Sequence, residues 1–340
     1  MPNKPKTING LMKYLRESKG LQISGSLQKR KLMNIGYYHG YKGYRYITKP
    51  SNHAAFSQFD ELLAVYEFDN QLKALFYPYV MQIETALKNY VLEVIVQRIH
   101  SDSFSDVYSK LLDNYKAFST TGKVYPTINE RRKAEEKFKK ELQKRLDLRN
   151  RIYNVQANAF KKDNKIAHHF LSEDKPLPIW GIFELLSLGE FGHFVSCLNE
   201  SCRRDISRKI GIRSSDDTNA MMPQRLIYTT KDLRNAIAHN DVVFDTRFKT
   251  GAIDQHMNRV ISNATNVQGI TFNTVTDYLV LLLYQLKLLQ VNKTELRRLI
   301  TGFSEAQERL RASVPTSIYA QIIHTNSNRK IQDLKAFIAR

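Results

Sequence analysis

Apolar residues recur along most of this chain at the three- and four-residue spacing of α-helices. Between Thr7, which can cap a helix, and Gly20, which can end one, this spacing predicts a first helix. A second short helix is predicted from Ser26 to Gly36. A much longer apolar pattern then begins at Phe59, so most of the first hundred residues are expected to be helical.

The long pattern runs from Phe59 to about His100 and contains Pro78. Proline lacks a backbone donor and clashes with the preceding turn, so a kink or break is expected there. Loops and short helices are predicted from Ser101 to Asn129. Further helices are predicted at 130–160, from near Trp180, after Pro223, and at 272–291, 293–312 and 327–339.

No internal repeat and no convincing two-residue alternation is present, so the predicted fold class is all-α. The chain divides into three predicted segments: a basic, tyrosine-rich helical segment at 1–50, a helical core at 51–250, and a C-terminal helical extension at 251–340.

Composition places the chain among folded globular proteins, because 42% of its residues are hydrophobic and 25% are charged. The most apolar stretch, Tyr278 to Leu289, is short and is broken by Gln285 and Lys287, so no membrane span is expected. No secretion signal is apparent, and the two cysteines have a poor spacing for a disulfide. We therefore expect a cytoplasmic protein.

The formal net charge of +19 is concentrated in two stretches. Residues 1–50 hold 11 Lys or Arg and the single acid Glu17, and residues 131–165 hold 13 Lys or Arg and 5 acids. A strongly basic surface attracts polyanions through counterion release, so a nucleic-acid partner is expected. A solvated basic surface that only improves solubility is the alternative interpretation.

Aromatic and cationic residues alternate in IGYYHGYKGYRYI, at 35–47. Such a segment can stack bases and neutralise phosphates, although tyrosines buried around a tight turn give the same pattern. The residues predicted to bind RNA in the two basic stretches are Lys29, Arg30, Lys31, Tyr37, Tyr38, Lys42, Arg45, Arg131, Arg132 and Lys133.

The segment KDLRNAIAHND, at 231–241, joins an arginine, an asparagine and a histidine on one side of a predicted helix. Pro223 can start this helix. Its apolar face is formed by Leu226, Leu233, Ala236 and Ile237. Arg234, Asn235 and His239 lie on the opposite arc, and the last two are an i, i+4 pair whose side chains can meet.

An arginine fork binds phosphate and an imidazole titrates near neutral pH, so Arg234 and His239 are candidates for metal-independent RNA cleavage. In that reaction the ribose 2′-OH attacks the adjacent phosphate, a base takes its proton, and a cation stabilises the developing charge. Because only one such pair occurs, two subunits are expected to join their motif helices. The alternative is an Arg234 ion pair with Asp232 or Asp241, and a histidine placed favourably at a helix C-terminus.

Glu84 lies among apolar residues one turn before Lys88, and either a surface ion pair or a buried polar residue facing a site would explain it. Metal-capable side chains also cluster elsewhere, but their spacing does not bring them to one point, so neither a metal nor a cofactor is expected. These side chains are His168, His169, Glu173 and Asp174.

Five segments resemble, in the same order, the successive blocks of the Abi-like abortive-infection family (D/F type), whose RN-x-x-A-H-N signature is of the HEPN ribonuclease type. They are LMKYLRESKGLQI, NIGYYHGYKGY, LLAVYEFDNQLKALFYPYVMQIETALKNYV, LPIWGIFELLSLGEFGHF, and LRNAIAHND with the VVFDTRF that follows it. The resemblance covers roughly Pro5 to Phe248.

This resemblance implies a HEPN-like helical bundle, an endoribonuclease toxin of phage defence, and a homodimer formed through the motif helices. It assigns Arg234 and His239 as the catalytic pair, Asn235 as their polar neighbour, and Glu84 as a supporting acid. A toxin needs restraint, so the basic stretches also suggest a structured RNA that silences the enzyme. The alternative function is a non-catalytic RNA-binding module or a regulatory scaffold.

Overall fold

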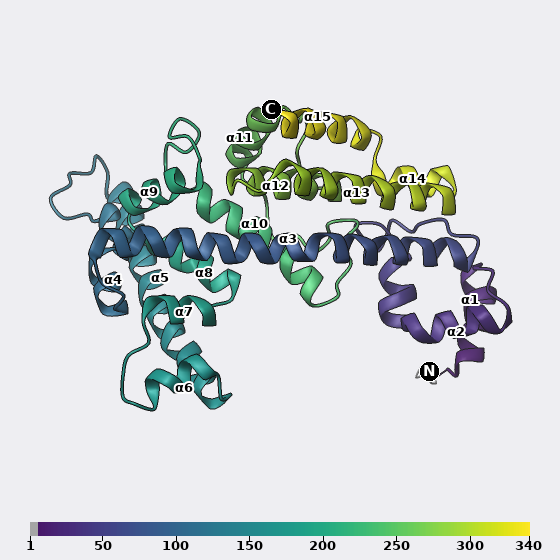
Figure 1. Cartoon of the computed structure of the whole chain (residues 1–340), viewed down its shortest axis with the longest axis horizontal. Coiled ribbons are helices and arrows are strands. Elements are labelled where there is room, and N and C mark those ends of the chain that lie inside the picture. Colours follow the sequence, from purple (N-terminus) through teal and green to yellow (C-terminus); the bar gives the residue numbers. More distant parts are fainter. Residues whose placement is uncertain (1–5) are drawn as a thin grey trace. The chain divides into compact units, whose positions relative to one another are not determined.

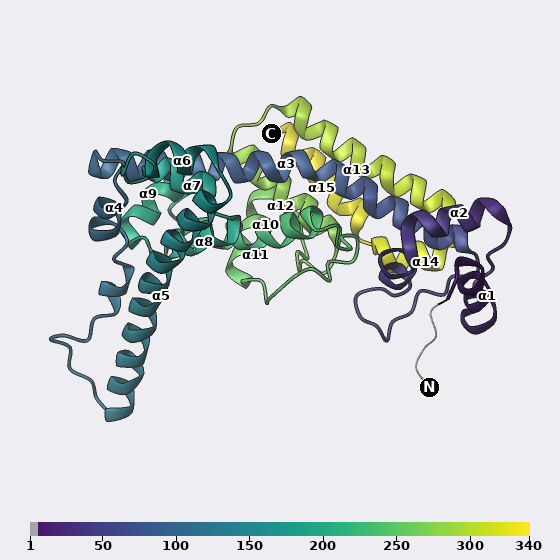
Figure 2. The ribbon, with the colours of Figure 1, turned by 90° about the horizontal axis from the view of Figure 1, so that it is seen from below.

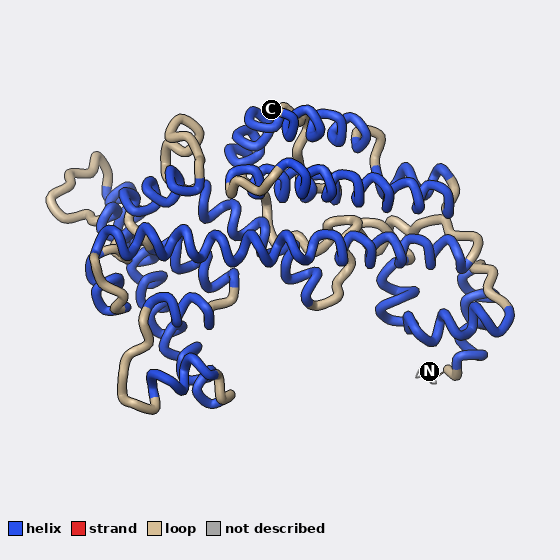
Figure 3. Tube along the Cα trace, viewed as in Figure 1, coloured by secondary structure: helices blue, strands red, loops and turns tan. Residues whose placement is uncertain are grey.

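The computed structural model describes residues 6–340, and these form α-helices, two other short helical segments and connecting loops (Figure 1). No strand is present in this part of the chain, as Figure 3 shows, so the predicted all-α fold class is confirmed. None of the described helices is both long enough and apolar enough to cross a membrane. The chain forms two compact units, one of residues up to 81 with 232–340 and one of residues 82–231.

The first unit begins with α1 (Ile8–Lys19) and α2 (Gly25–Ile35). As predicted, the Thr7 hydroxyl accepts from the backbone N–H of Gly10, and Gly20 ends α1 with a left-handed φ of 67°. After Ile35 the chain continues without a break into η1 (Gly36–Lys42), which is a π-helix rather than a loop.

Helix α3 (Phe59–Ile99) passes through Pro78 without interruption, so the break considered at this proline does not occur. The cost of the missing backbone hydrogen bond is offset by apolar burial on both sides of it. Phe76, Tyr79 and Val80 are each exposed by 9% or less. Residues 59–81 of this helix belong to the first unit and 82–99 to the second.

The C-terminal extension consists of α11 (Gln255–Thr265), α12 (Val275–Leu288), α13 (Lys293–Ser313), α14 (Thr316–Ile323) and α15 (Ser327–Ala339). Helices α12, α13 and α15 pack against one another, and in Figure 1 α15 runs beside the row in which α12 and α13 overlap. Every residue of α12 from Val275 to Leu286 is buried. Phe303 of α13 stacks on Phe76 of α3 with ring centroids 6.1 Å apart. The extension therefore shares its core with the first part of α3.

The second unit contains α4 (Phe104–Lys110), η2 (Asn114–Phe118), α5 (Ile128–Lys161), α6 (Lys165–Leu171), α7 (Ile179–Leu185), α8 (Leu188–Cys197) and α9 (Glu200–Ile210). Phe183, Phe191 and Phe194 pack edge to face at its centre. In Figure 2 the N-terminal half of α5 extends away from α6, α7 and α8. None of the residues 128–147 is buried, so this half of α5 is an exposed, charged arm.

Candidate functional site

The RN-x-x-A-H-N motif, residues 234–240, lies at and just beyond the C-terminal end of α10 (Met222–Ala238). As predicted, its apolar face is buried, with Leu226 and Leu233 fully inaccessible. Arg234 and Asn235 are half-buried, and Nη1 of Arg234 donates to Oδ1 of Asn235 at 3.3 Å. His239 is exposed, and among the described residues its imidazole has no hydrogen-bond or ion-pair partner. The imidazole is therefore open to a ligand.

A Schellman-type turn ends α10 directly after His239. Asn240 adopts a left-handed φ of 56°. Its N–H donates to the carbonyl of Ile237 at 3.2 Å, and the N–H of Asp241 donates to the carbonyl of Ala236 at 2.8 Å. His239 thus occupies the C-cap, directly after the last residue of the helix. The tight turn sends the chain away from the helix axis immediately beyond the imidazole.

A buried polar network fixes the segment that follows the turn. Asp69 accepts from the backbone N–H groups of Val243 and Phe244, both at 2.7 Å. It also accepts from the hydroxyl of Tyr44 at 2.6 Å and forms an ion pair with Lys73 at 2.8 Å. Since Asp69 is fully inaccessible, this network ties the segment after the motif to α3.

The network reaches the motif turn and the tyrosine-rich segment as well. Lys73 donates from Nζ to Oδ1 of Asn240 at 2.9 Å. Burial, followed by the adjacent carboxylate of Asp69, raises the pKa of the Tyr44 phenol, so this hydroxyl stays protonated and donates. Sequence reasoning missed Asp69 and Lys73. Their signal was an i, i+4 charged pair within an apolar stretch, the same pattern that singled out Glu84.

A second connection joins residues 43–48 to residues 245–247. Arg247 donates to the carbonyls of Gly43 at 2.7 Å and Tyr46 at 2.8 Å, and from Nε to Asp245 at 2.8 Å. Its guanidinium lies 4.1 Å from the centre of the Tyr46 ring. Neither Arg247 nor Asp245 was predicted from the sequence to belong to a site.

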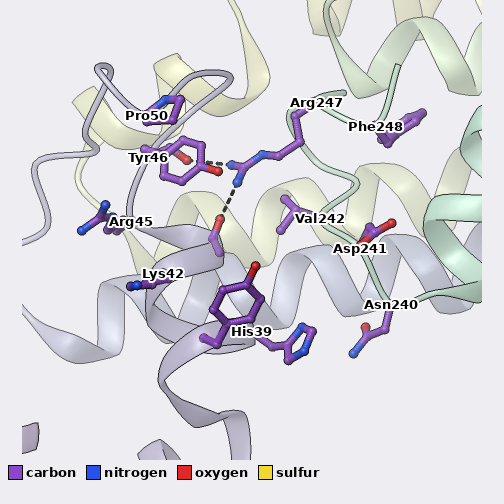
Figure 4. A pocket seen from close by; sticks show the side chains of 12 residues that line it. His39, Lys42, Arg45, Tyr46, Pro50, Asn240, Asp241, Val242, Arg247 and Phe248 are labelled. Atoms are coloured by element: carbon purple, nitrogen blue, oxygen red, sulfur yellow. Dashed lines mark hydrogen bonds between the residues drawn. The ribbon is translucent and has the colours of Figure 1, made fainter. Parts of the chain in front are cut away.

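These two connections form a pocket of about 520 Å³ (Figure 4). One side comes from η1 and the loop after it, and the other from the chain after α10. Figure 4 shows His39 and Asn240 reaching the pocket from these two elements. The lining residues are Tyr38, His39, Lys42, Gly43, Arg45, Tyr46, Pro50, Asn240, Asp241, Val242, Arg247 and Phe248.

The predicted RNA-binding residues fall into three places. Tyr38, Lys42 and Arg45 line the pocket, whereas Tyr37 packs beside them on Tyr41 with ring centroids 5.6 Å apart. A second group lies on α2 and comprises Lys29, Arg30 and Lys31. The third group is exposed near the start of the α5 arm and comprises Arg131, Arg132 and Lys133.

Glu84 forms the expected i, i+4 ion pair with Lys88 at 3.1 Å, but the pair is buried rather than on the surface. Lys88 also donates from Nζ to the carbonyl of Leu186 at 2.8 Å. The prediction of an ion pair on the surface was therefore wrong, because the Glu84–Lys88 pair is buried. As for metals, residues 6–340 contain no group of three or more His, Cys, Asp or Glu arranged to hold an ion.

An all-helical protein whose motif helix ends beside a cationic, aromatic pocket matches a known family. The family of Abi-like proteins matches residues 30–245, which is more than half of the chain. The chain belongs to this Abi-like family. The first block of the resemblance, before residue 30, lies outside the match. No curated protein and no solved structure matches the chain significantly.

Proposed function

We propose that this Abi-like protein is a metal-independent endoribonuclease that acts as a toxin in abortive infection. The observation that carries the proposal is the exposed end of α10. There Arg234 and Asn235 are followed, a little over one turn later, by an imidazole that has no partner among the described residues. An arginine fork and a histidine presented by one helix end are suited to a single bound phosphodiester.

In the proposed reaction His239 takes the proton of a ribose 2′-OH as that oxygen attacks the adjacent phosphorus. The new bond joins the 2′ oxygen to phosphorus, and the bond from phosphorus to the 5′ oxygen breaks. Arg234 stabilises the charge on the non-bridging oxygens. The products are a cyclic 2′,3′-phosphate and a free 5′-hydroxyl. DNA has no 2′-OH and is not a substrate.

The leaving 5′ oxygen needs a proton, and the proposed donor is His239 of a second copy of the chain. Two motif helices related by a two-fold axis would supply one acid and one base. The dimer is part of the proposal because one chain supplies a single motif histidine.

The test is to incubate purified protein with labelled single-stranded RNA in EDTA, beside a DNA strand of the same sequence. We expect the RNA alone to be cut. His239→Ala should slow cleavage by about 10²- to 10⁴-fold, because it removes an acid–base group. His169→Ala is the matched control, since His169 is also exposed and belongs to α6.

Arg234→Ala should slow cleavage by about 10²-fold or more, as expected for loss of a group that stabilises transition-state charge. Its unfolding temperature is measured in parallel, because Arg234 is half-buried. RNA left intact by the wild-type protein in EDTA would contradict the enzymatic proposal.

We further propose that a structured RNA binds the α5 arm and restrains the enzyme. The support is electrostatic: Arg132, Lys133 and Lys140 are exposed, and none forms an ion pair with another described residue. A helical arm with unpaired cations is suited to the phosphate backbone of a folded RNA, which is bound through charge and shape. An RNA that stays bound would make this protein the toxin of a toxin–antitoxin pair.

A further inference from the structure

The pocket between η1 and the segment Asn240–Phe248 has a lining that is both cationic and aromatic. We propose that it binds one nucleotide of a single-stranded RNA, next to the phosphodiester held at the end of α10. The choice of RNA as the ligand rests on the proposed ribonuclease function. The pocket itself is a separate binding site, because neither Arg234 nor His239 lines it.

The cations of the pocket identify the charge of the ligand. Asp241 is the only acidic residue in the lining. Lys42 and Arg45 form no ion pair with any described residue, and Nε of Arg45 is buried without a hydrogen-bond acceptor. Buried donors normally have partners, and cations that outnumber the carboxylates and form no ion pair with them favour an anion. A phosphate group would neutralise both side chains.

Arg247 does not share this role. Its guanidinium donates to Asp245 and to the carbonyls of Gly43 and Tyr46, so each of its three nitrogens already donates to the protein. It acts instead as a clamp that holds one side of the pocket in place. A pocket held in its binding geometry before the ligand arrives loses less entropy on binding.

The aromatic part of the lining identifies the rest of the ligand. Tyr38 is 71% exposed, and its ring has one aromatic neighbour, His39, with centroids 5.3 Å apart. In contrast, Tyr41 and Tyr44 of the same segment are buried. A tyrosine ring exposed beside unpaired cations is the combination that binds single-stranded nucleic acid, where bases stack and phosphates pair. The volume of about 520 Å³ lies within the range of pockets that hold small ligands.

The position of the pocket links it to the motif. Asn240 and Asp241 line it and directly follow His239 in the sequence. Oδ1 of Asn240 is used by Lys73, but its Nδ2 has no acceptor among the described residues and can donate to a base edge. A strand anchored here would therefore continue to the imidazole within a nucleotide or two.

The test measures binding separately from cleavage. A fluorescent single-stranded RNA is titrated by anisotropy into His239→Ala protein, which leaves the probe intact. Adding Tyr38→Ala should weaken binding by about 5- to 150-fold, the range found for loss of one stacking ring. Tyr38→Trp should restore it. Tyr77→Ala is the matched control, since Tyr77 is 51% exposed and does not line the pocket.

The phosphate contact is tested by Lys42→Ala in the same background. It should lower the slope of log affinity against log salt by about 0.7, the contribution of one phosphate contact on a single strand. Lys335→Ala, which removes an exposed lysine outside the pocket, should leave the slope unchanged.

Equal affinities for Tyr38→Ala and Tyr77→Ala, or no RNA binding in the His239→Ala background, would overturn the pocket assignment. Cleavage in EDTA by otherwise wild-type protein is recorded independently. If the wild-type protein cleaves RNA but the pocket variants bind RNA with unchanged affinity, the nucleotide site is refuted and the ribonuclease proposal is not. Weakened binding in the pocket variants without cleavage by the wild-type protein refutes the ribonuclease proposal and supports the site.

Discussion

At the scale of single residues, the geometry of the candidate site depends strongly on Asp69. This one carboxylate contacts three separate parts of the first unit: the hydroxyl of Tyr44, the ammonium of Lys73, and the backbone that follows the motif. Lys73 passes the connection on to Asn240, the residue after His239. A charge that is buried and fully hydrogen-bonded can position a segment more tightly than apolar contacts, which have no preferred direction.

Asp69→Asn should lower the free energy of unfolding of the first unit by about 3–5 kcal/mol, as expected when one partner of a buried ion pair is removed. The amide keeps the size of the carboxylate but leaves Lys73 buried without a counter-charge. Urea denaturation followed by circular dichroism measures the change. Glu67→Gln is the matched control, because Glu67 is exposed on the same helix. Equal losses in both variants would show that the network contributes little.

At the scale of elements, η1 places Tyr38 and Lys42 at the pocket, and its path requires close packing against α2. A Cβ added at Gly40 would lie 2.5 Å from Cγ1 of Ile35. That distance is far shorter than a normal contact, so one of the two segments must move. π-Helical segments often occur at functional sites. In η1, Gly40 occupies the position that lies closest to the side chain of Ile35.

Gly40→Ala should therefore destabilise the first unit by about 1–3 kcal/mol through overpacking and weaken RNA binding at the pocket. Ile35→Ala in the same chain should recover part of both losses by making room for the methyl group. Thermal unfolding and the anisotropy titration measure the two effects. Gly251→Ala is the control, since nothing lies within 4 Å of its added Cβ. If Gly40→Ala behaves like Gly251→Ala, η1 tolerates a side chain there.

The elements also show what sequence can reveal. Helical spacing predicted α1, α13 and α15, each of which buries an apolar face, and it also predicted α2, α12 and the two faces of α10. It missed α11 and α14, which have 11 and 8 residues, although Met257, Val260 and Ile261 of α11 lie at helical spacing and are buried, so a signal for α11 was present and was overlooked. It also missed η1, because a π-helical segment of 7 residues is too short to show its own apolar period.

For the candidate site, the sequence predicted individual residues but not how they are arranged. Chemistry alone pointed to Arg234, His239, Tyr38, Lys42 and Arg45. Their arrangement was not predictable, because it depends on contacts between residues about 200 positions apart. The bond from Arg247 to the carbonyl of Gly43 spans 204 positions, and nothing local in either segment specifies the other.

At the scale of the whole molecule, the charge of +19 is spread over both compact units. The first unit holds the pocket and the motif, and the second holds the α5 arm. A single strand bound for cleavage needs few phosphate contacts, so the exposed cations of α5 exceed what the proposed reaction uses. This excess is the basis for placing a structured RNA on the second unit.

The two cysteines allow that location to be tested, because Cys197 and Cys202 both belong to the second unit. Burial raises the pKa of Cys197 to about 11 and that of Cys202 to about 12. Both thiols are therefore protonated and shielded at neutral pH, and a thiol reagent should label them only when the unit opens. An RNA bound to this unit opposes opening, so labelling should slow by about 100-fold at an RNA concentration 100 times its Kd.

The RNA for this experiment is the species retained from total cellular RNA in a band-shift titration at rising salt. Replacing Arg132, Lys133 and Lys140 together by alanine should remove the protection and lower the salt slope by about 2 to 3. Replacing Lys49, Arg329 and Lys335 changes the net charge equally on the first unit and should leave protection intact. Because both triple variants lose the same charge, a difference in protection between them is not an effect of net charge and reports where the RNA binds. Protection that survives loss of the α5 cations would place the RNA elsewhere, and no retained RNA species would remove the case for an RNA antitoxin.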